Sequence, residues 1–394
     1  MTPRTPDIAP ARSVRRPRAA AQAGFSIVEV LVALALGMAL TVAITVLMTT
    51  HDATRRALTS TNDAQLNANY LSYVLDRQLR SAGSGYAQGW DSTYGCLVRA
   101  SRGGVQLLPR TDAFPAPFAS VQQQLRLAPL LIHAGIGAGG SDVLAVTAGA
   151  SGQGEVASSV LPGSATATSV NIATTVGMRG GDLILVAEPA LGCMLQQLAV
   201  PFTGGASEVL TIGGAYAPTG AIAGLQLASF SGAAKVSLLG NPAGNPPQWQ
   251  LIGLGSDGTL FSYDLLRLDG SDTPRAIADG IVTLRARYGV DTNSDGQLDT
   301  WIAPTAAGYT AADLQDGSDA ARNRLRGIMA VRVGIILRGE RAERTAVSPS
   351  TLALFGDLPA DLRVSYSPSD AERQMRLRTV EFTVPLRNAI HQLR

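Results

Sequence analysis

The pattern of apolar and polar positions changes sharply along the chain, and its first clear element is an apolar run. From Phe25 to Met48 the residues are apolar or small at nearly every position, and the one charged residue among them is Glu29. A bilayer-spanning helix needs about 20 apolar residues, so residues 25–50 are predicted to form one. A carboxylate inside such a helix costs about 2.5–3.5 kcal/mol on insertion scales, so Glu29 requires an explanation.

The apolar run continues into an amphipathic segment, residues 51–82. Its apolar residues recur at steps of three or four positions or multiples of them, which indicates a helix with one apolar stripe: Leu58, Leu66, Tyr70, Val74 and Leu79. No proline occurs between Phe25 and Pro109, and Gly83 and Gly85 are typical of a helix end. The pattern predicts one helix over residues 25–82, whose second half needs a sheet to cover its stripe.

Residues 83–394 show short apolar or alternating runs between Gly, Pro, Ser and Asp turns, which indicates a β-rich region. The predicted strands are Asp142–Ala148, Ser169–Thr174, Asp182–Ala187, Leu195–Phe202, Val209–Ile212, Trp249–Gly253, Leu260–Arg267, Ile281–Val290, Met329–Leu337 and Leu377–Leu386. The turn Ser256-Asp257-Gly258 predicts a hairpin between two of them. The expected fold class is α+β.

Charge is distributed unevenly. Without residues 1–24 the basic count falls from 32 to 27 and the acidic count from 30 to 29, so the net charge changes from +2 to −2. This balance gives no reason to expect a nucleic-acid partner. A basic leader before an apolar helix predicts a cytoplasmic leader and an extracytoplasmic C-terminal region. A secretory signal peptide is disfavoured, because the apolar run exceeds 7–15 residues and no small-x-small cleavage site follows it.

The leader ends in a recognisable motif. The segment Gly24-Phe25-Ser26-Ile27-Val28-Glu29 resembles the processing site of type IV prepilins, although a leader of 24 residues is long for the common pilin class. The resemblance implies that a prepilin peptidase cleaves after Gly24 and methylates the new amino terminus at Phe25. Glu29 then becomes the fifth mature residue. A buried carboxylate is tolerated when a cation pairs with it, so Glu29 of one subunit is expected to pair with the Phe25 amine of a neighbour.

Later segments extend the resemblance to the PilW-type minor pilins. They read GIVTLRARYGVDTNSDGQLDTW, AVRVGIILR and RTVEFTVPLRN, together with RSAGSGYAQGW at the end of the helix. The resemblance implies a pilin-like lollipop, with a long helix packed on a β-rich head at residues 83–394. It implies a subunit of the inner membrane, with a periplasmic head, that enters the pilus and reaches the cell surface. Its expected partners are other minor pilins, the major pilin and a tip adhesin, in a tip complex that primes assembly and serves adhesion and twitching motility.

Two alternatives remain open. A minor pseudopilin of a type II secretion system shares the processing site and the lollipop shape. A membrane-anchored extracytoplasmic enzyme or adhesive binding module would need a convergent polar site, and none is evident. The motif at Gly135–Gly140 matches G-x-G-x-x-G, but a predicted strand rather than a helix follows it. No catalytic motif appears, so we expect a protein that is not an enzyme.

One polar segment has the spacing of a calcium loop. Oxygen-bearing residues alternate around a glycine, Gly296, in the order D-x-[DN]-x-[DN]-G: Asp291, Asn293, Asp295, Gln297 (through its carbonyl) and Asp299. The twelfth position, Ile302, lacks the usual glutamate, so Asp313 or Asp316 would have to complete the shell. The alternative interpretation is a polar β-turn. Calcium is the only cofactor that the sequence suggests.

The chain has two cysteines, Cys96 and Cys193, both in the predicted extracytoplasmic region. Because that compartment permits disulfides, their number and location favour one bridge over two buried thiols. A bridge closing a loop of about 100 residues stabilises a protein by a few kcal/mol in the chain-entropy model.

Overall fold

The structure is a computed structural model that describes residues 24–150, 156–218 and 220–390. By its internal contacts the chain divides into two units, Met1–Leu58 and Thr59–Arg394. The first helix, α1 (Ile27–Arg80), begins in one unit and ends in the other. It lies within the predicted range of residues 25–82. The predicted leader falls outside the described residues except for Gly24.

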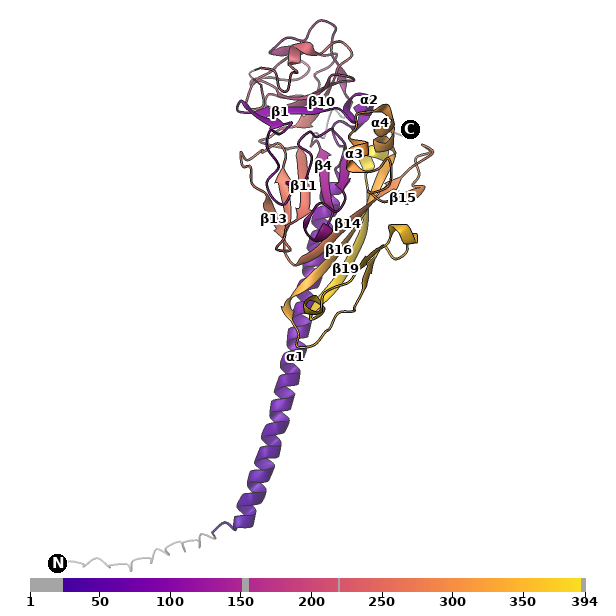
Figure 1. Cartoon of the computed structure of the whole chain (residues 1–394). Helices are drawn as coiled ribbons and strands as arrows, with labels where there is room; N and C mark the ends of the chain where they lie inside the picture. Colours follow the sequence, from indigo (N-terminus) through magenta and orange to yellow (C-terminus); the bar gives the residue numbers. More distant parts are fainter. Residues whose placement is uncertain (1–23, 151–155, 219, 391–394) are drawn as a thin grey trace, which may run out of the picture. The chain divides into compact units, whose positions relative to one another are not determined.

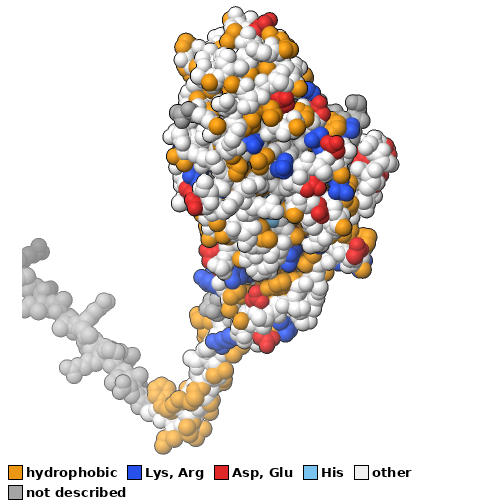
Figure 2. Space-filling view, turned by 45° about the horizontal axis from the view of Figure 1, so that its top comes forward, with side chains coloured by type: hydrophobic (Ala, Val, Ile, Leu, Met, Phe, Trp, Pro, Cys, Tyr) orange, Lys and Arg blue, Asp and Glu red, His pale blue; other side chains and the backbone are white. Residues whose placement is uncertain are grey.

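In the first unit, α1 exposes apolar side chains around its whole circumference. Every described residue from Gly24 to His51 is exposed, and orange side chains cover much of the visible face of this part of the helix in Figure 2. Within the segment Ile27–His51, an 18-residue window has a mean hydropathy of 2.6. By length and composition the segment qualifies as a membrane span, and a signal sequence near an N-terminus meets the same criteria.

The threonine hydroxyls in this part of the helix bond to carbonyl groups of the same helix. The Thr41 hydroxyl donates to the Gly37 carbonyl at 2.8 Å, and the Thr45 hydroxyl donates to the Thr41 carbonyl at 2.8 Å. Thr49 and Thr50 bond back along the helix in the same way. A hydroxyl bonded in this manner is not left unpaired when the helix enters an apolar environment.

In the second unit, one stripe of α1 enters the main hydrophobic core. The stripe consists of residues that are at most 3% exposed and lie three or four positions apart: Ala68, Leu71, Leu75, Leu79 and the following Ala82. The predicted stripe was wrong in part, because Leu66 is 65% exposed and Tyr70 is 53% exposed. The buried residues keep to one helical face, and Leu66 and Tyr70 lie on another. Leu58 belongs to the residues whose side chains are not described.

Three larger sheets make up most of the second unit. In spatial order, the first contains β2 (Val105–Leu108), β1 (Val98–Arg102), β8 (Gly192–Gln197), β7 (Leu183–Glu188), β10 (Lys235–Gly240) and β5 (Ser158–Ser159). The second contains, again in spatial order, β13 (Arg275–Ala278), β12 (Leu260–Asp264), β11 (Gln248–Leu254), β4 (Val143–Ala148) and β3 (Leu130–His133). The third runs from β15 (Thr300–Ile302) through β14 (Ile281–Val290) and β16 (Ile328–Ala342) to β19 (Met375–Pro385).

Smaller elements complete the second unit. Two strand pairs form, β17 (Leu352–Leu354) with β18 (Val364–Tyr366) and β6 (Ser169–Asn171) with β9 (Val209–Thr211). The short helices are α2 (Trp90–Thr93), α3 (Ala311–Leu314), α4 (Asp319–Gly327), α5 (Asp370–Arg373) and α6 (Arg387–Ile390). Figure 1 shows α2, α3 and α4 gathered at one end of the sheet that contains β14 and β16. A helix followed by several sheets agrees with the predicted α+β class.

The predicted strands differ in accuracy. The predicted strand at residues 281–290 coincides with β14, and the predicted hairpin at Ser256-Asp257-Gly258 joins β11 to β12, with Leu254 opposite Leu260. Gly258 has φ +84°, which a glycine adopts without strain. The prediction of a strand over residues 195–202 was wrong, because β8 begins at Gly192 and pairs with β7 from there, Gly192 lying opposite Glu188.

Buried hydrogen bonds connect the second and third sheets. Asp142, only 1% exposed, accepts from the Gly135 N–H at 3.0 Å and from the Ala286 N–H at 2.8 Å. It also pairs with Arg285 at 3.3 Å. The Tyr288 hydroxyl accepts from the Ile132 N–H at 2.6 Å. Burial raises the pKa of Asp142, although these hydrogen bonds oppose the shift.

His133, at the end of β3, makes the second unit sensitive to acid. It is 5% exposed, and burial lowers its pKa to about 4 from 6.5. Between these pH values the unfolded chain takes up a proton that the folded chain does not, so stability falls as the pH falls. We expect His133 to account for a loss of roughly 2–3 kcal/mol over this window.

The prediction is tested by comparing the wild-type protein with His133→Gln, which has no titratable imidazole at this position. Denaturant unfolding of the full chain in detergent, at pH 7 and pH 4.5, is the measurement. The wild-type protein is expected to lose more stability between the two pH values than the variant. An equal loss in both proteins contradicts the prediction.

Candidate functional site

The predicted cleavage site lies in an open segment directly before α1. No heavy atom lies within 4 Å of the position that a Cβ on Gly24 would occupy. Phe25 is 82% exposed. The Ser26 carbonyl accepts from the Glu29 N–H at 2.9 Å, and its hydroxyl accepts from the Val28 N–H at 3.3 Å. Residues 24–26 are therefore exposed, and Ser26 caps the first turn of the helix.

Glu29 lies in the first turn of α1. Its side chain is exposed, and among the described residues no hydrogen bond or ion pair involves its carboxylate. The partial positive charge at a helix N-terminus favours a carboxylate in this position. Within the described part of this chain, however, no cation neutralises it. A partner cation would have to come from elsewhere.

The two cysteines lie where two strands of the first sheet meet. Cys96 and Cys193 are joined by a disulfide, with their Cα atoms 5.6 Å apart. Cys96 precedes β1 and Cys193 belongs to β8, and the two strands run parallel, with Val98 opposite Cys193. Both cysteines are buried, so the bridge holds the segment after α2 against the core.

The predicted calcium loop follows β14 and is held by its own hydrogen bonds. Asp291 is 4% exposed. Its Oδ1 accepts from the Ser294 N–H at 2.6 Å and from the Asn293 N–H at 3.2 Å, and its Oδ2 accepts from the Gly296 N–H at 2.8 Å. Gly296 has φ +85°, which suits glycine. Asp291 therefore organises the turn through backbone N–H groups.

The other side chains of the loop also bond locally. Asp295 accepts from the Gln297 N–H at 2.8 Å, and Asp299 accepts from both the Thr292 hydroxyl and the Thr292 N–H at 2.7 Å. These last bonds lower the pKa of Asp299. Asn293 accepts from the Asp295 N–H at 2.9 Å.

The two residues predicted to complete the calcium shell, Asp313 and Asp316, accept hydrogen bonds from backbone N–H groups in other turns. Asp313 accepts from the Gly308 N–H, and Asp316 accepts from the Ser318 N–H. Across the described ranges, no group of three or more His, Cys, Asp or Glu side chains is placed to hold a metal ion. Calcium binding by the loop therefore stays a prediction.

The third sheet and this loop fall within a region that matches a family model. The family model for type IV pilus-assembly protein W, PilW, matches residues 253–388, which is 136 of the 394 residues. The match supports a protein of type IV pilus assembly. No curated protein and no solved structure matches the chain. A pilus-assembly family suggests other pilus components as partners and fits the apolar helix Ile27–His51, a membrane anchor or signal by composition.

The loop makes a testable contribution to stability. Replacing Asp291 by Ala leaves the Asn293, Ser294 and Gly296 N–H groups without their acceptor. Asp291→Ala is expected to lower the free energy of unfolding by about 1–3 kcal/mol. Asp295→Ala, in the exposed part of the same loop, serves as the control and should cost less. The measurement is denaturant unfolding of the full chain in detergent, and equal losses for the two variants contradict the prediction.

Melting in calcium and in chelator distinguishes the two interpretations of the loop. If calcium binds, the wild-type protein gains about 2.7 kcal/mol at a hundredfold excess of calcium over its Kd. Asp295→Ala should then remove the gain. If the wild-type protein melts at the same temperature in both buffers, the loop is a polar turn.

Proposed function

We propose that this protein is a minor pilin that primes assembly of a type IV pilus, in a tip complex with other minor pilins and a large tip adhesin. The observation that carries the proposal is the combination of two features in one chain. The region 253–388 matches PilW, and the distant N-terminus carries an exposed apolar helix with Glu29 in its first turn, after the sequence GFS.

The first step of the proposed mechanism is processing at the inner membrane. Prepilin peptidase cleaves after Gly24, in the open segment before α1, and methylates the new amine of Phe25. This amine is a cation at the end of an apolar helix. The cleaved subunit then carries both a carboxylate, Glu29, and a cation within the first turn of the same helix.

Assembly follows from the cost of these two charges in lipid. Glu29 of an incoming subunit pairs with the Phe25 amine of a subunit already in the filament. A buried charge that gains a partner loses much of its burial cost, so the pairing favours transfer from the membrane to the filament. Neighbouring helices, including those of the major pilin, would cover the apolar surface that α1 exposes between Ile27 and His51.

A minor pseudopilin of a type II secretion system would use the same mechanism. The description of the matched family, type IV pilus-assembly protein W, favours the pilus. Deleting the gene separates the two functions: loss of surface pili with normal protein secretion supports the proposal, and the reverse result supports the pseudopilin.

Processing is tested by mass spectrometry of the mature N-terminus. We expect N-methylated Phe25 as the first residue. Gly24→Val should block cleavage because the peptidase requires a small residue before the cut. Gly37→Val is the matched control, since nothing lies within 4 Å of a Cβ at either glycine and neither change disturbs packing within the chain. An assembled subunit that retains its leader contradicts the prediction.

Recruitment is tested with Glu29→Ala. The variant should enter the membrane and lose its leader normally, because it removes a charge from an apolar helix. Its content in sheared pili, relative to the membrane, should fall about tenfold or more, as expected for loss of a charged hydrogen-bonded pair. Thr41→Val is the control, since the Thr41 hydroxyl bonds within its own helix. Equal incorporation of Glu29→Ala and wild type means that Glu29 does not recruit subunits.

A further inference from the structure

A polar cavity in the second unit has no part in the proposed assembly mechanism. It has a volume of about 320 Å³ and lies between the segment before β1, the turn joining β7 to β8, and α4. Its lining includes three arginines, Arg99, Arg126 and Arg322, and one carboxylate, Glu188. We refer to it as the arginine cavity. Ligand sites of small molecules typically enclose about 300–1,000 Å³.

Backbone carbonyl groups hold each arginine in place. Nη1 of Arg99 donates to the Leu191 carbonyl at 3.1 Å, and Nη1 of Arg126 donates to the Gly95 carbonyl at 2.8 Å. Nε of Arg322 donates to the Tyr94 carbonyl at 3.3 Å. A guanidinium has five N–H donors in a rigid plane, so these bonds fix the groups and leave donors for a ligand.

Two glycines provide the space that these arginines occupy. A Cβ on Gly192 would lie 2.6 Å from Nη1 of Arg99, and a Cβ on Gly317 would lie 2.6 Å from the guanidinium carbon of Arg126. Both glycines have positive φ, +113° and +81°. As the two arginines are placed, a side chain at either glycine would overlap a guanidinium group, and the positive φ of both positions also favours glycine.

Two carboxylates near these arginines, Glu188 and Asp319, already have partners. Glu188 accepts from the Ser231 N–H at 2.7 Å and from the Ser231 hydroxyl at 2.8 Å. Asp319 pairs with Arg322 at 2.9 Å. Within the described residues, neither Arg99 nor Arg126 forms an ion pair with a carboxylate. Burial lowers the pKa of Arg99, and the charge of Arg126 lowers it further, so the two cations repel each other.

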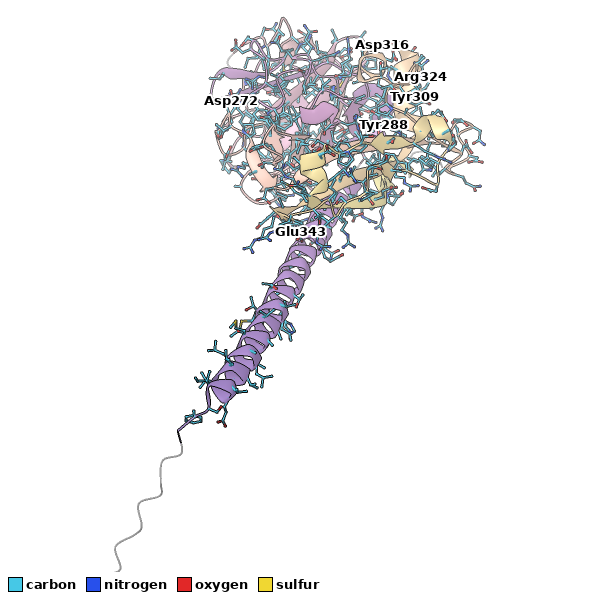
Figure 3. The ribbon with its side chains drawn as sticks, turned by 60° about the horizontal axis from the view of Figure 1, so that its bottom comes forward. Asp272, Tyr288, Tyr309, Asp316, Arg324 and Glu343 are labelled. Atoms are coloured by element: carbon cyan, nitrogen blue, oxygen red, sulfur yellow. A yellow bond between two sulfur atoms is a disulfide. The ribbon has the colours of Figure 1, made fainter. Side chains whose placement is uncertain are left out.

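A further carboxylate, Asp316, interacts electrostatically with one of the cavity arginines, Arg126. The Ser318 N–H lowers the pKa of Asp316 most, and the charges of Arg324 and Arg126 lower it further. Figure 3 places Asp316 and Arg324 on the same side of the second unit, opposite Asp272. Asp316 moderates the positive charge of the cavity but forms no ion pair with Arg126.

We propose that the arginine cavity binds a carboxylate group through Arg99 and Arg126. A planar guanidinium matches a carboxylate with two parallel N–H···O bonds. Glu188 lines the cavity, Asp319 pairs with Arg322, and Asp316 interacts electrostatically with Arg126. These carboxylates keep the net positive charge small, which favours a singly charged group over a doubly charged phosphate. The carboxylate belongs either to an acidic peptide segment or to a small organic acid. The inference is independent of the proposed pilus function.

The test is calorimetric titration of the full chain in uncharged detergent micelles. The probes are the capped peptide Ala-Glu-Ala, its Ala-Gln-Ala counterpart, succinate and inorganic phosphate. We expect the glutamyl peptide, succinate or both to bind, and the glutaminyl peptide not to bind. Binding of the peptide alone identifies an acidic segment, and binding of succinate alone identifies a free acid. Phosphate binding as tightly as the carboxylates, or no carboxylate binding, overturns the proposal.

Variants assign the binding to the cavity. Arg99→Gln and Arg126→Gln should each weaken carboxylate binding about tenfold or more. Arg275→Gln is the control, because that side chain is 71% exposed and lies outside the cavity. Unchanged affinity in Arg99→Gln and Arg126→Gln overturns the proposal.

A second measurement uses only the wild-type protein and so does not depend on the variants folding. Phenylglyoxal modifies accessible arginines, and peptide mass mapping measures the extent at each one. The bound carboxylate should protect Arg99 and Arg126 and leave Arg275 unprotected. Equal modification with and without the carboxylate overturns the proposal.

Discussion

The burial of one stripe of α1 is the interaction on which the second unit depends. Leu71, Leu75 and Leu79 are at most 1% exposed and share a hydrophobic cluster with residues of the second and third sheets. Burying a leucine fully stabilises a fold by about 1.5–3 kcal/mol, so these three side chains alone contribute several kcal/mol. The sheets are thereby held on one helix, and the same helix continues toward the N-terminus as the exposed apolar segment Ile27–His51.

The two ends of α1 differ in how their apolar side chains are covered. In the second unit the helix is amphipathic, and the protein itself covers its apolar face. In the first unit every described side chain from Gly24 to His51 is exposed, so no described part of the same chain covers its apolar surface. By length and composition such a segment fits a membrane anchor or a signal sequence. Glu29 is the one charged residue in this segment, and the proposed pairing with a neighbour's amine would offset the cost of burying its carboxylate.

Two buried aspartates in the second unit are satisfied mainly by backbone N–H groups. Asp291 closes its own loop, and Asp142 accepts N–H groups from two segments and thereby connects two sheets. Backbone groups also hold the polar side chains of the arginine cavity, where carbonyl groups accept hydrogen bonds from Arg99 and Arg126. The difference is charge: the buried aspartates have cationic or N–H partners, whereas these two arginines have no carboxylate paired with them in the described structure.

The sequence alone determined the features that depend on neighbouring residues. The apolar run, the continuous helix, β14 and the hairpin at Ser256-Asp257-Gly258 follow from local periodicity and turn chemistry, which a short window of sequence contains. The late strands carried the resemblance to PilW-type proteins, and the family match at residues 253–388 agrees with that part. The GFSIVE motif lies outside the matched region, and its processing stays a prediction.

Only the tertiary structure decided which face of α1 is buried and which distant residues meet. Helical spacing is compatible with several stripes, and contact with the sheets selected Leu71 and Leu75 over Leu66 and Tyr70. Arg99, Arg126 and Gly317 are far apart along the chain, and no pattern within one segment predicts that they line one cavity. The physical reason is that burial and charge pairing depend on the path of the whole backbone, whereas periodicity depends only on the residues within a few turns.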